Sequence, residues 1–162
     1  EGKTRFIFYS GDADKASVAV KLGRFDTLQT SINVADQRVL EEILPAPAAA
    51  GMGVIAKRPV ANVAWKHGDD GPENDYHSSY WERLRKLDFE FARLPLVEAV
   101  EIALRFTVFQ PGVSTAIVGT SSPGRWAQNA ASVAKGPLPA AQVEQLRKRW
   151  MEREEPGWFG QQ

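Results

Sequence analysis

One predicted turn of the chain contains small hydroxyl residues and is followed by a basic side chain, at a spacing suited to binding an anion. It leads from a predicted strand into a helix predicted to begin at Pro123. The amides at a helix N-terminus and the helix dipole attract phosphate. Arg125 follows one turn later, and its planar guanidinium can bind two phosphate oxygens. A simpler alternative is that a serine caps the helix and Arg125 is solvated. The residues of the turn are Gly119, Thr120, Ser121 and Ser122.

Polar side chains also stand at the ends of three other predicted strands. Ser10 and Gln29 are assigned to the ends of two of them, Lys57 ends a third, and Arg58 comes directly after it. In barrels of alternating strands and helices, active sites are assembled at the carboxyl ends of the strands. These residues are therefore candidates for binding a ligand. The alternatives are that Gln29 is a hydrogen-bonded polar group at a strand end, and that the two basic residues are charges at a strand mouth.

The elements that must position these side chains alternate along the chain. Strands are predicted over 5–10, 27–33, 54–57 and 115–119. Helices are predicted over 14–22, 36–44, 76–87, 95–110, 123–133 and 139–155, with Gly23 capping the first and Pro45 and Pro47 disrupting the second. This alternation indicates parallel strands with right-handed crossovers. It fits a doubly wound sheet or half of a (β/α)8 barrel. Whole barrels take about 250 residues, so four units favour half a barrel.

Composition limits the functions that the chain can have. The 162 residues are 43% hydrophobic and 25% charged, which is typical of one globular domain. Lys and Arg together number 20, as do Asp and Glu, so no basic excess points to nucleic acid or to a membrane surface. The absence of cysteine excludes disulfides and thiolate chemistry, and is compatible with the cytoplasmic location that we expect. The chain opens at Glu1 in an apparent helix-to-strand turn, as if cut from something longer.

The order of the motifs resembles the aldo-keto reductase family along nearly the whole chain. The matching blocks are GKTRFI with YSG (2–11), GRFDTLQ with SIN (23–33), GVIAKRP (53–59), ALRF (103–106), PGV (111–113), TAIVGTSS (115–122) and residues 125–129. The resemblance implies an α/β fold: the C-terminal half of a (β/α)8 TIM barrel, with four parallel strands and flanking helices. Residues 1–162 then form a single partial barrel domain, with a loop and helix excursion at 60–94 and a C-terminal tail at 156–162.

The same resemblance implies roles for the polar residues. Ser10 and Gln29 match positions that hydrogen-bond the nicotinamide carboxamide. Arg125 matches the contact to the adenosine 2′-phosphate, which favours NADP over NAD. Gln128 and Asn129 match adenine-side residues. The turn at 119–122 matches the family's phosphate loop.

Two positions depart from the family pattern. Gly11 stands where an asparagine commonly follows the serine, so one carboxamide contact is absent or is replaced by backbone. Lys57 stands where many members have a tyrosine that stacks on the nicotinamide. Lysine cannot stack in this way. With Arg58 it could instead pair with the cofactor diphosphate or the substrate.

The catalytic tetrad of the family, an aspartate, a tyrosine, a lysine and a histidine, belongs to the first half of the barrel. None of the four matches a residue here, so no catalytic residue is assigned. Tyr9 lies near a strand end without a lysine or histidine partner. His67 and His77 fall in the excursion, where we expect surface positions, and two histidines make a weak metal site. We expect no metal, and we expect the acidic run at 69–75 to be a solvated loop.

The resemblance implies an oxidoreductase that acts on a small carbonyl or alcohol substrate, present here as its cofactor-binding half. The alternatives are a non-catalytic NADP-binding or oligomerising module, or another phosphate-binding α/β enzyme. Half a barrel has two open sheet edges, so we expect it to bind its missing N-terminal half or to form a homodimer. The aromatic excursion could form a lid or pack on the barrel exterior. Trp158 in the tail is a candidate substrate contact.

Overall fold

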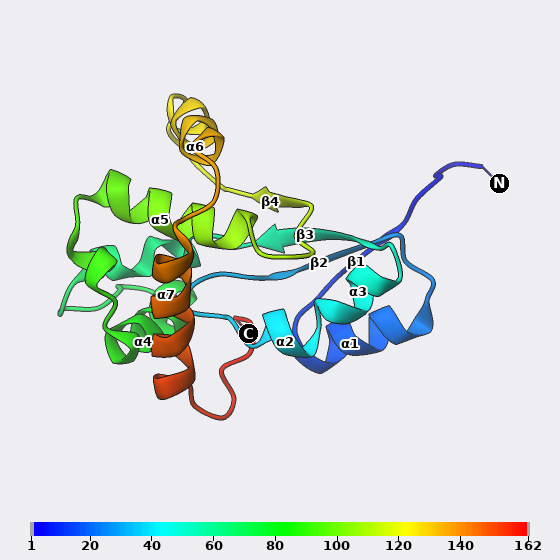
Figure 1. Cartoon of the computed structure of the whole chain (residues 1–162), viewed down its shortest axis with the longest axis horizontal. Coiled ribbons are helices and arrows are strands. Elements are labelled where there is room, and N and C mark those ends of the chain that lie inside the picture. Colours follow the sequence, from blue (N-terminus) through cyan, green and yellow to red (C-terminus); the bar gives the residue numbers. More distant parts are fainter. Residues whose placement is uncertain (1, 162) are drawn as a thin grey trace.

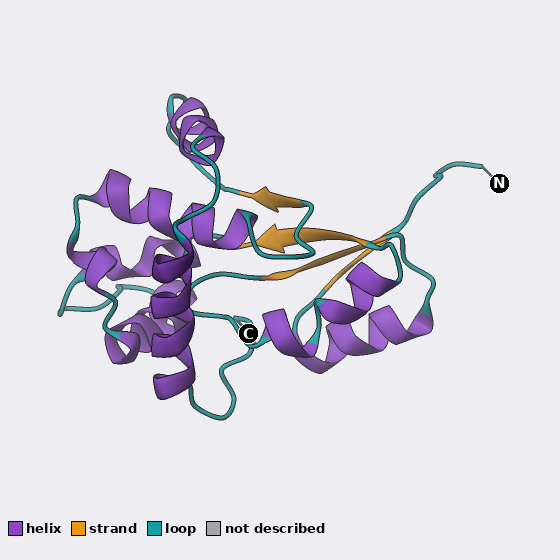
Figure 2. Ribbon diagram, in the orientation of Figure 1, coloured by secondary structure: helices purple, strands orange, loops and turns teal. Residues whose placement is uncertain are grey.

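Four parallel strands form a single sheet in the order β1-β2-β3-β4 (Figure 2). The computed structural model describes residues 2–161, so Glu1 and Gln162, the ends of the predicted domain and tail, lie outside the described residues. The strands are β1 (Phe8–Ser10), β2 (Thr27–Ser31), β3 (Gly53–Lys57) and β4 (Thr115–Ile117). The predicted parallel sheet is confirmed, although three of its strands are shorter than the sequence pattern indicated.

The two faces of the sheet differ in exposure. Successive side chains of a strand point to opposite faces, and Leu28, Val54 and Ala56 are buried on the face that the helices cover. On the other face Phe8 is 60% exposed and Ile117 is 50% exposed. In a closed barrel this second face is the packed interior. Here that face is open.

The first group of helices covers the sheet from below in Figure 1. It comprises α1 (Ala13–Leu22), α2 (Val39–Glu42) and α3 (Pro45–Ala49). Gly23 caps α1 with a φ of 58°, as predicted. The prediction of one helix over 36–44 is wrong, because Pro45 begins α3 rather than disrupting a helix. In the first turn of a helix the missing amide of proline has no partner to lose.

The second group of helices lies together at the left of Figure 1. It contains one of the two hydrophobic cores, and the other lies between the sheet and the first group of helices. The second group comprises η1 (Ala61–His67), α4 (Asp75–Leu87), η2 (Glu90–Arg93), α5 (Leu96–Val108) and α7 (Ala140–Arg153), of which η1 and η2 are 3-10 helices. Tyr80, Phe89 and Phe91 of the aromatic excursion are buried in the core of this group. The structure thus favours packing over a mobile lid for these three rings. None of the helices in the described chain is long and apolar enough to cross a membrane.

The chain that leaves β3 enters an unusual turn. Ala61, Asn62 and Val63 have φ values of 47°, 54° and 54°, in the left-handed region that L-residues avoid. Such residues cost about 1–3 kcal/mol each, and a β-branched valine is especially unfavourable there. The Asn62 side-chain amide donates a hydrogen bond of 2.7 Å to Gln161 Oε1 in the tail. The tail therefore helps to hold this turn.

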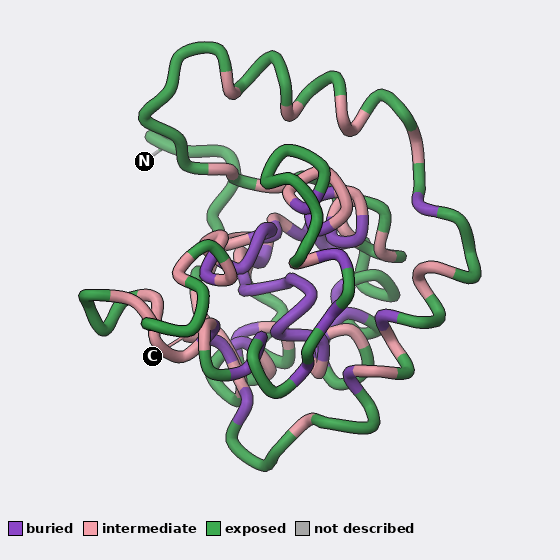
Figure 3. Tube along the Cα trace, turned by 90° about the vertical axis from the view of Figure 1, so that its left-hand side faces the viewer, coloured by how far each residue is buried: buried purple, intermediate pink, exposed green. Residues whose placement is uncertain are grey.

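Helix α6 (Arg125–Ala134) lies at the periphery and has no buried residue (Figure 3), although its Val133 packs against the core of the second group of helices. It is held to α5 through Glu101, which accepts hydrogen bonds from Lys135 Nζ (2.7 Å) and Ser132 Oγ (3.3 Å). The prediction of a helix from Pro123 with a serine cap is wrong. Residue Gly124 takes the cap position, and no side chain there bonds to the helix amides.

Candidate functional site

Ser10, the last residue of β1, lies beside Gln29, the middle residue of β2, so the prediction that Gln29 ends its strand is wrong. The two residues are paired in the parallel register, and Gln29 Nε2 donates a hydrogen bond of 3.3 Å to Ser10 Oγ. Both lie on the face of the sheet opposite the buried Leu28 and Thr30. The open face therefore presents a hydroxyl and an amide side by side, at the end of β1 and the middle of β2. Such a pair can bind a planar amide, which needs both a donor and an acceptor.

Asp12 organises the basic residues of this edge. Its Oδ2 lies 3.0 Å from Lys57 Nζ and 3.7 Å from Arg58 Nη1. Its Oδ1 accepts hydrogen bonds from Ser31 N (2.7 Å) and Thr30 Oγ1 (3.0 Å). Burial alone would raise the pKa of Asp12, but these hydrogen bonds and the charge of Lys57 outweigh it, so the pKa is lowered. Asp12 is thus a carboxylate that holds both cations in place.

Asp12 was not among the site residues predicted from the sequence. It lies in a segment, 11–14, that the sequence shows only as polar, and its basic partners lie at the end of β3, which is not adjacent to β1. Lys57 and Arg58 do lie at the strand ends, as expected, with side chains only 19% and 20% exposed. Arg58 Nη1 also donates a hydrogen bond of 2.9 Å to Ser31 Oγ.

A second polar network lies deeper, behind the strand ends. Tyr80 Oη donates a hydrogen bond of 3.2 Å to Asp36 Oδ2, and Arg83 Nη1 lies 3.9 Å from the same oxygen. Burial raises the pKa of Asp36 to about 7, despite the opposing charge of Arg83. Burial and the charge of Asp36 raise the pKa of Tyr80 far above its usual range. Because Tyr80 is fully buried and a poor acid, it cannot protonate a substrate.

The C-terminal tail closes over this charged edge. Arg83 Nη2 donates a hydrogen bond of 2.8 Å to the carbonyl oxygen of Gly160. A Cβ added to Gly160 would lie 2.6 Å from Asp12 Cβ, so only glycine fits there. Trp158 was a candidate substrate contact, but it is 8% exposed and packs against Trp150 with ring centroids 5.6 Å apart. The structure therefore gives Trp158 a core role and brings Gly160, not Trp158, to the strand ends.

The candidate phosphate loop follows β4, which pairs with β3. The loop residues Gly119, Thr120 and Ser121 are all exposed, and Thr120 Oγ1 accepts a hydrogen bond of 3.1 Å from Ser122 N. The next three candidates lie on α6, and their side chains make no hydrogen bond or ion pair within residues 2–161. The donors of this loop and helix are thus free to bind a ligand. The three α6 residues are Arg125, Gln128 and Asn129.

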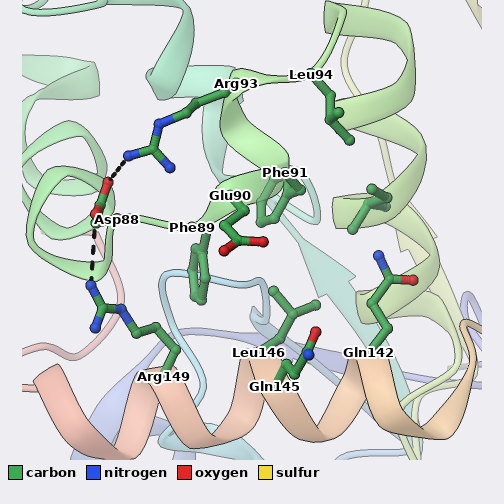
Figure 4. A pocket seen from close by; sticks show the side chains of 11 residues that line it. Asp88, Phe89, Glu90, Phe91, Arg93, Leu94, Gln142, Gln145, Leu146 and Arg149 are labelled. Carbon is green, nitrogen blue, oxygen red and sulfur yellow. Dashed lines mark hydrogen bonds and ion pairs between the residues drawn. The ribbon is translucent and has the colours of Figure 1, made fainter.

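Figure 4 shows a cavity of about 620 Å³ in a different part of the molecule. It lies between η2, α5 and α7, with Phe89, Phe91 and Leu146 among its lining residues. At one side Asp88 pairs with both Arg93 and Arg149. No residue at the carboxyl ends of the strands lines this cavity, so it is separate from the candidate site.

A family model described as "Aldo/keto reductase family" matches residues 2–150. Curated protein sequences give no match. The fold is similar to that of aldo-keto reductase AKR11C1 from Bacillus halodurans. For the apo form the TM-score is 0.65 at 23% identity, over 86% of this chain and 49% of that chain. For the holo form the TM-score is 0.60 at 20% identity, over 86% and 48%. The chain spans about half the length of these structures. The similarity over this half confirms the α/β half-barrel architecture.

Proposed function

The chain belongs to the aldo/keto reductase family, and from this premise we propose that it is the cofactor-binding half of an NADP-dependent oxidoreductase. The complete enzyme would interconvert a small carbonyl compound and the corresponding alcohol. The observation that carries the proposal is the pairing of Ser10 with Gln29 on the open face of the sheet. The nicotinamide carboxamide is the planar amide that this pair would bind. Once bound, the cofactor would supply a hydride.

The opposite end of the cofactor would lie along the β4–α6 segment. Arg125 lacks a side-chain partner in the described chain and stands at the start of a helix, so its guanidinium is available for the adenosine 2′-phosphate. Gln128 and Asn129 would contact the adenine. The loop amides at 119–121 would bind phosphate oxygens. These free donors support a cofactor that carries an extra phosphate, which is NADP rather than NAD.

Lys57 and Arg58 would flank the middle of the site. Asp12 holds their charged groups at the carboxyl ends of the strands. Because the two side chains are already ordered, they lose less rotamer entropy when a ligand binds. We propose that the two cations contact the cofactor diphosphate or the substrate from this fixed position. Asp12 would be the positioning residue for both.

Catalysis would need groups from outside these strands. The transfer of a hydride to a carbonyl requires a proton donor beside the reacting oxygen. Tyr80 is buried, and His67 and His77 lie away from the strand ends, in η1 and α4. The missing half of the barrel would therefore supply the acid and its partners. It would also cover the open sheet face, where Phe8 and Ile117 are exposed.

A second copy of the chain is the other partner that the open face could accept. Two half-barrels related by a two-fold axis would pair their edges and bury their interior faces. Such a homodimer would be a non-catalytic NADP-binding or oligomerising module. Each copy would contribute the same cofactor-binding residues, and neither would contribute the catalytic tetrad of the family. This alternative rests on the same exposed residues. A cytoplasmic location stays a prediction.

The direct experiment is a titration of the chain with NADPH and with NADH, followed by tryptophan fluorescence. We expect NADPH to bind at least about tenfold more tightly, a difference of about 1.4 kcal/mol. Arg125→Ala should remove this preference and leave NADH binding nearly unchanged. Arg153→Ala is the matched control, since Arg153 is exposed at the end of α7. Equal affinities for the two nucleotides would argue against an NADP site, and absence of binding to both would mean that the missing strands complete it.

A further inference from the structure

The cavity between η2, α5 and α7 has the size of a small-molecule site (Figure 4). Its volume of about 620 Å³ lies within the usual range for such sites, about 300–1,000 Å³. Its apolar lining includes Phe89, Phe91 and Leu146, which are 5%, 6% and 6% exposed. The rings of Phe89 and Phe91 are stacked, with centroids 5.4 Å apart and planes inclined by 26°. Because these side chains belong to the core of the second group of helices, the cavity has a fixed apolar floor.

The two arginines that line the cavity are already paired. Asp88 pairs with Arg93, and its Oδ2 lies 3.8 Å from Arg149 Nη2. Arg149 Nη1 also lies 4.0 Å from Glu152. In Figure 4 the guanidinium groups of Arg93 and Arg149 both point toward Asp88, at one side of the cavity. Two carboxylates thus balance two guanidinium groups, and this side has no excess positive charge for an anion.

Glu90 carries the charge that is left unbalanced. Among the charged residues that line the cavity, it alone has a side chain without an ion pair or hydrogen bond within residues 2–161. Its side chain points from η2 toward α7 in Figure 4, whereas Arg93 points toward Asp88. Glu90 is exposed, so a ligand can reach it from solvent. A negative charge beside an apolar floor attracts a cation and repels an anion.

The wall formed by α7 adds uncharged hydrogen-bonding groups. Gln142 and Gln145 line the cavity, and their side chains have no hydrogen-bond partner in the described part of the chain. The oxygen of a side-chain amide accepts hydrogen bonds. An ammonium group in the cavity would therefore have the Glu90 carboxylate on the η2 wall and amide oxygens on the α7 wall.

The apolar floor favours the same kind of ligand. The face of a phenylalanine ring is electron-rich and attracts a cation, and an apolar group that lies on the floor is removed from water. We propose that the cavity binds a small organic ammonium compound, in which a primary amine is attached to an aryl or alkyl group. Glu90 pairs with the ammonium group, and the stacked phenylalanine rings and Leu146 contact the apolar part. No residue at the strand ends lines the cavity, so this ligand and the proposed cofactor bind independently.

The test is calorimetric titration of the chain with tryptamine near neutral pH, where the amine is protonated. We expect one site per chain, with a dissociation constant of roughly 100 μM for a ligand of about a dozen non-hydrogen atoms. Indoleacetate has the same ring system with the opposite charge, and it should bind at least about tenfold more weakly. Saturating NADPH should leave the tryptamine affinity unchanged. Competition with NADPH would instead place tryptamine at the strand ends and would overturn the proposal.

Substitutions at one exposed position separate the charge from the fold. Glu90→Gln should weaken tryptamine binding by about fivefold or more. Glu144→Gln is the matched control, because Glu144 is exposed on α7 and does not line the cavity. Glu90→Lys should reverse the preference, so that indoleacetate binds more tightly than tryptamine, which a loss of structure would not produce. Absence of tryptamine binding at millimolar concentrations, equal affinities of the parent chain for the two compounds, or an affinity that Glu90→Gln leaves unchanged would each overturn the proposal.

Discussion

The Asp12 carboxylate and the Lys57 ammonium group lie 3.0 Å apart, although Asp12 follows β1 and Lys57 ends β3, and these strands are not neighbours in the sheet. β2 lies between β1 and β3, so the ion pair crosses the end of β2. It is strengthened there by the hydrogen bond from Ser31 N to Asp12. One carboxylate thereby links the carboxyl ends of three strands. The arrangement fixes the basic residues of the proposed cofactor site before any ligand arrives.

The first prediction concerns the strength of this link. Asp12→Asn should lower the free energy of unfolding by about 1–3 kcal/mol, because Lys57 loses its partner while remaining mostly buried. Urea denaturation provides the measurement. Asp70→Asn, in an exposed loop, is the control and should change the stability by less than about 0.5 kcal/mol. A double-mutant cycle with Lys57→Met should give a coupling of at least about 0.5 kcal/mol. Purely additive effects would show that the ion pair contributes nothing.

The second prediction concerns the contact between the tail and Asp12. Gly160→Ala places a Cβ 2.6 Å from Asp12 Cβ, in a residue with a φ of 55°. The clash should cost about 1–3 kcal/mol beyond the backbone strain. Gly157→Ala is a matched control, because Gly157 also has a positive φ but nothing within 4 Å of an added Cβ. Unfolding followed by tryptophan fluorescence should separate the two variants. Equal destabilisation would mean that the tail does not press on Asp12.

The third prediction concerns pH. Burial raises the folded-state pKa of Asp36 to about 7, above the ordinary value of 3.8. Between these values the unfolded chain loses the proton and the folded chain keeps it. The stability that Asp36 contributes is therefore complete below about pH 4 and is lost as the pH rises through 7, by up to about 1.4 kcal/mol per unit.

Asp36→Asn isolates this effect from the other titrating groups. Asparagine stays neutral and can still accept the hydrogen bond from Tyr80. The stability of the variant relative to the parent chain should therefore rise between pH 4.5 and 7 and then level off. Urea unfolding at four pH values in this range and above it gives the comparison. A difference that stays constant with pH would contradict the raised pKa.

The fourth prediction concerns the open face and edges of the sheet. The isolated chain should self-associate, and Ile117→Lys should weaken the association because the residue lies at the β4 edge and is 50% exposed. Val18→Lys is the control, since Val18 is 56% exposed on α1, which covers the other face. Sedimentation velocity over a range of concentrations distinguishes the variants. A stable, monodisperse monomer of the parent chain would count strongly against the homodimer.

Local signals in the sequence were enough to predict alternating strands and helices with parallel strands, and the motifs that resemble the family favoured half a barrel. The alternation of strands and helices, the left-handed cap at Gly23 and the helix that follows Pro95 each depend on a few neighbouring residues. The sequence placed Ser10 and Gln29 on adjacent strands, but the register of the sheet, which pairs the last residue of β1 with the middle residue of β2, brought them together. The match to the aldo/keto reductase family model is consistent with this alternation of strands and helices.

The boundaries and the contacts between distant residues depended on the tertiary structure. Pro45 begins a helix rather than disrupting one because the chain turns there, and proline is accommodated at a first turn. In the sequence, Asp12 is an ordinary acidic turn residue. Its role follows from the fold, which places Lys57 and Arg58 beside it. Asp36 has its raised pKa only in the folded chain, where burial beside Tyr80 of α4 separates it from water.

The sequence by itself therefore determined the alternation of strands and helices and the positions of Ser10, Lys57 and Arg58 at strand ends. These properties follow from backbone sterics and from hydrophobic periodicity, which act over a few residues. Only the tertiary structure decided how Asp12 pairs across β2, why Trp158 is buried and how His67 meets His77. Such contacts join residues that are distant in the chain. Their electrostatics depend on burial, and burial is a property of the assembled fold.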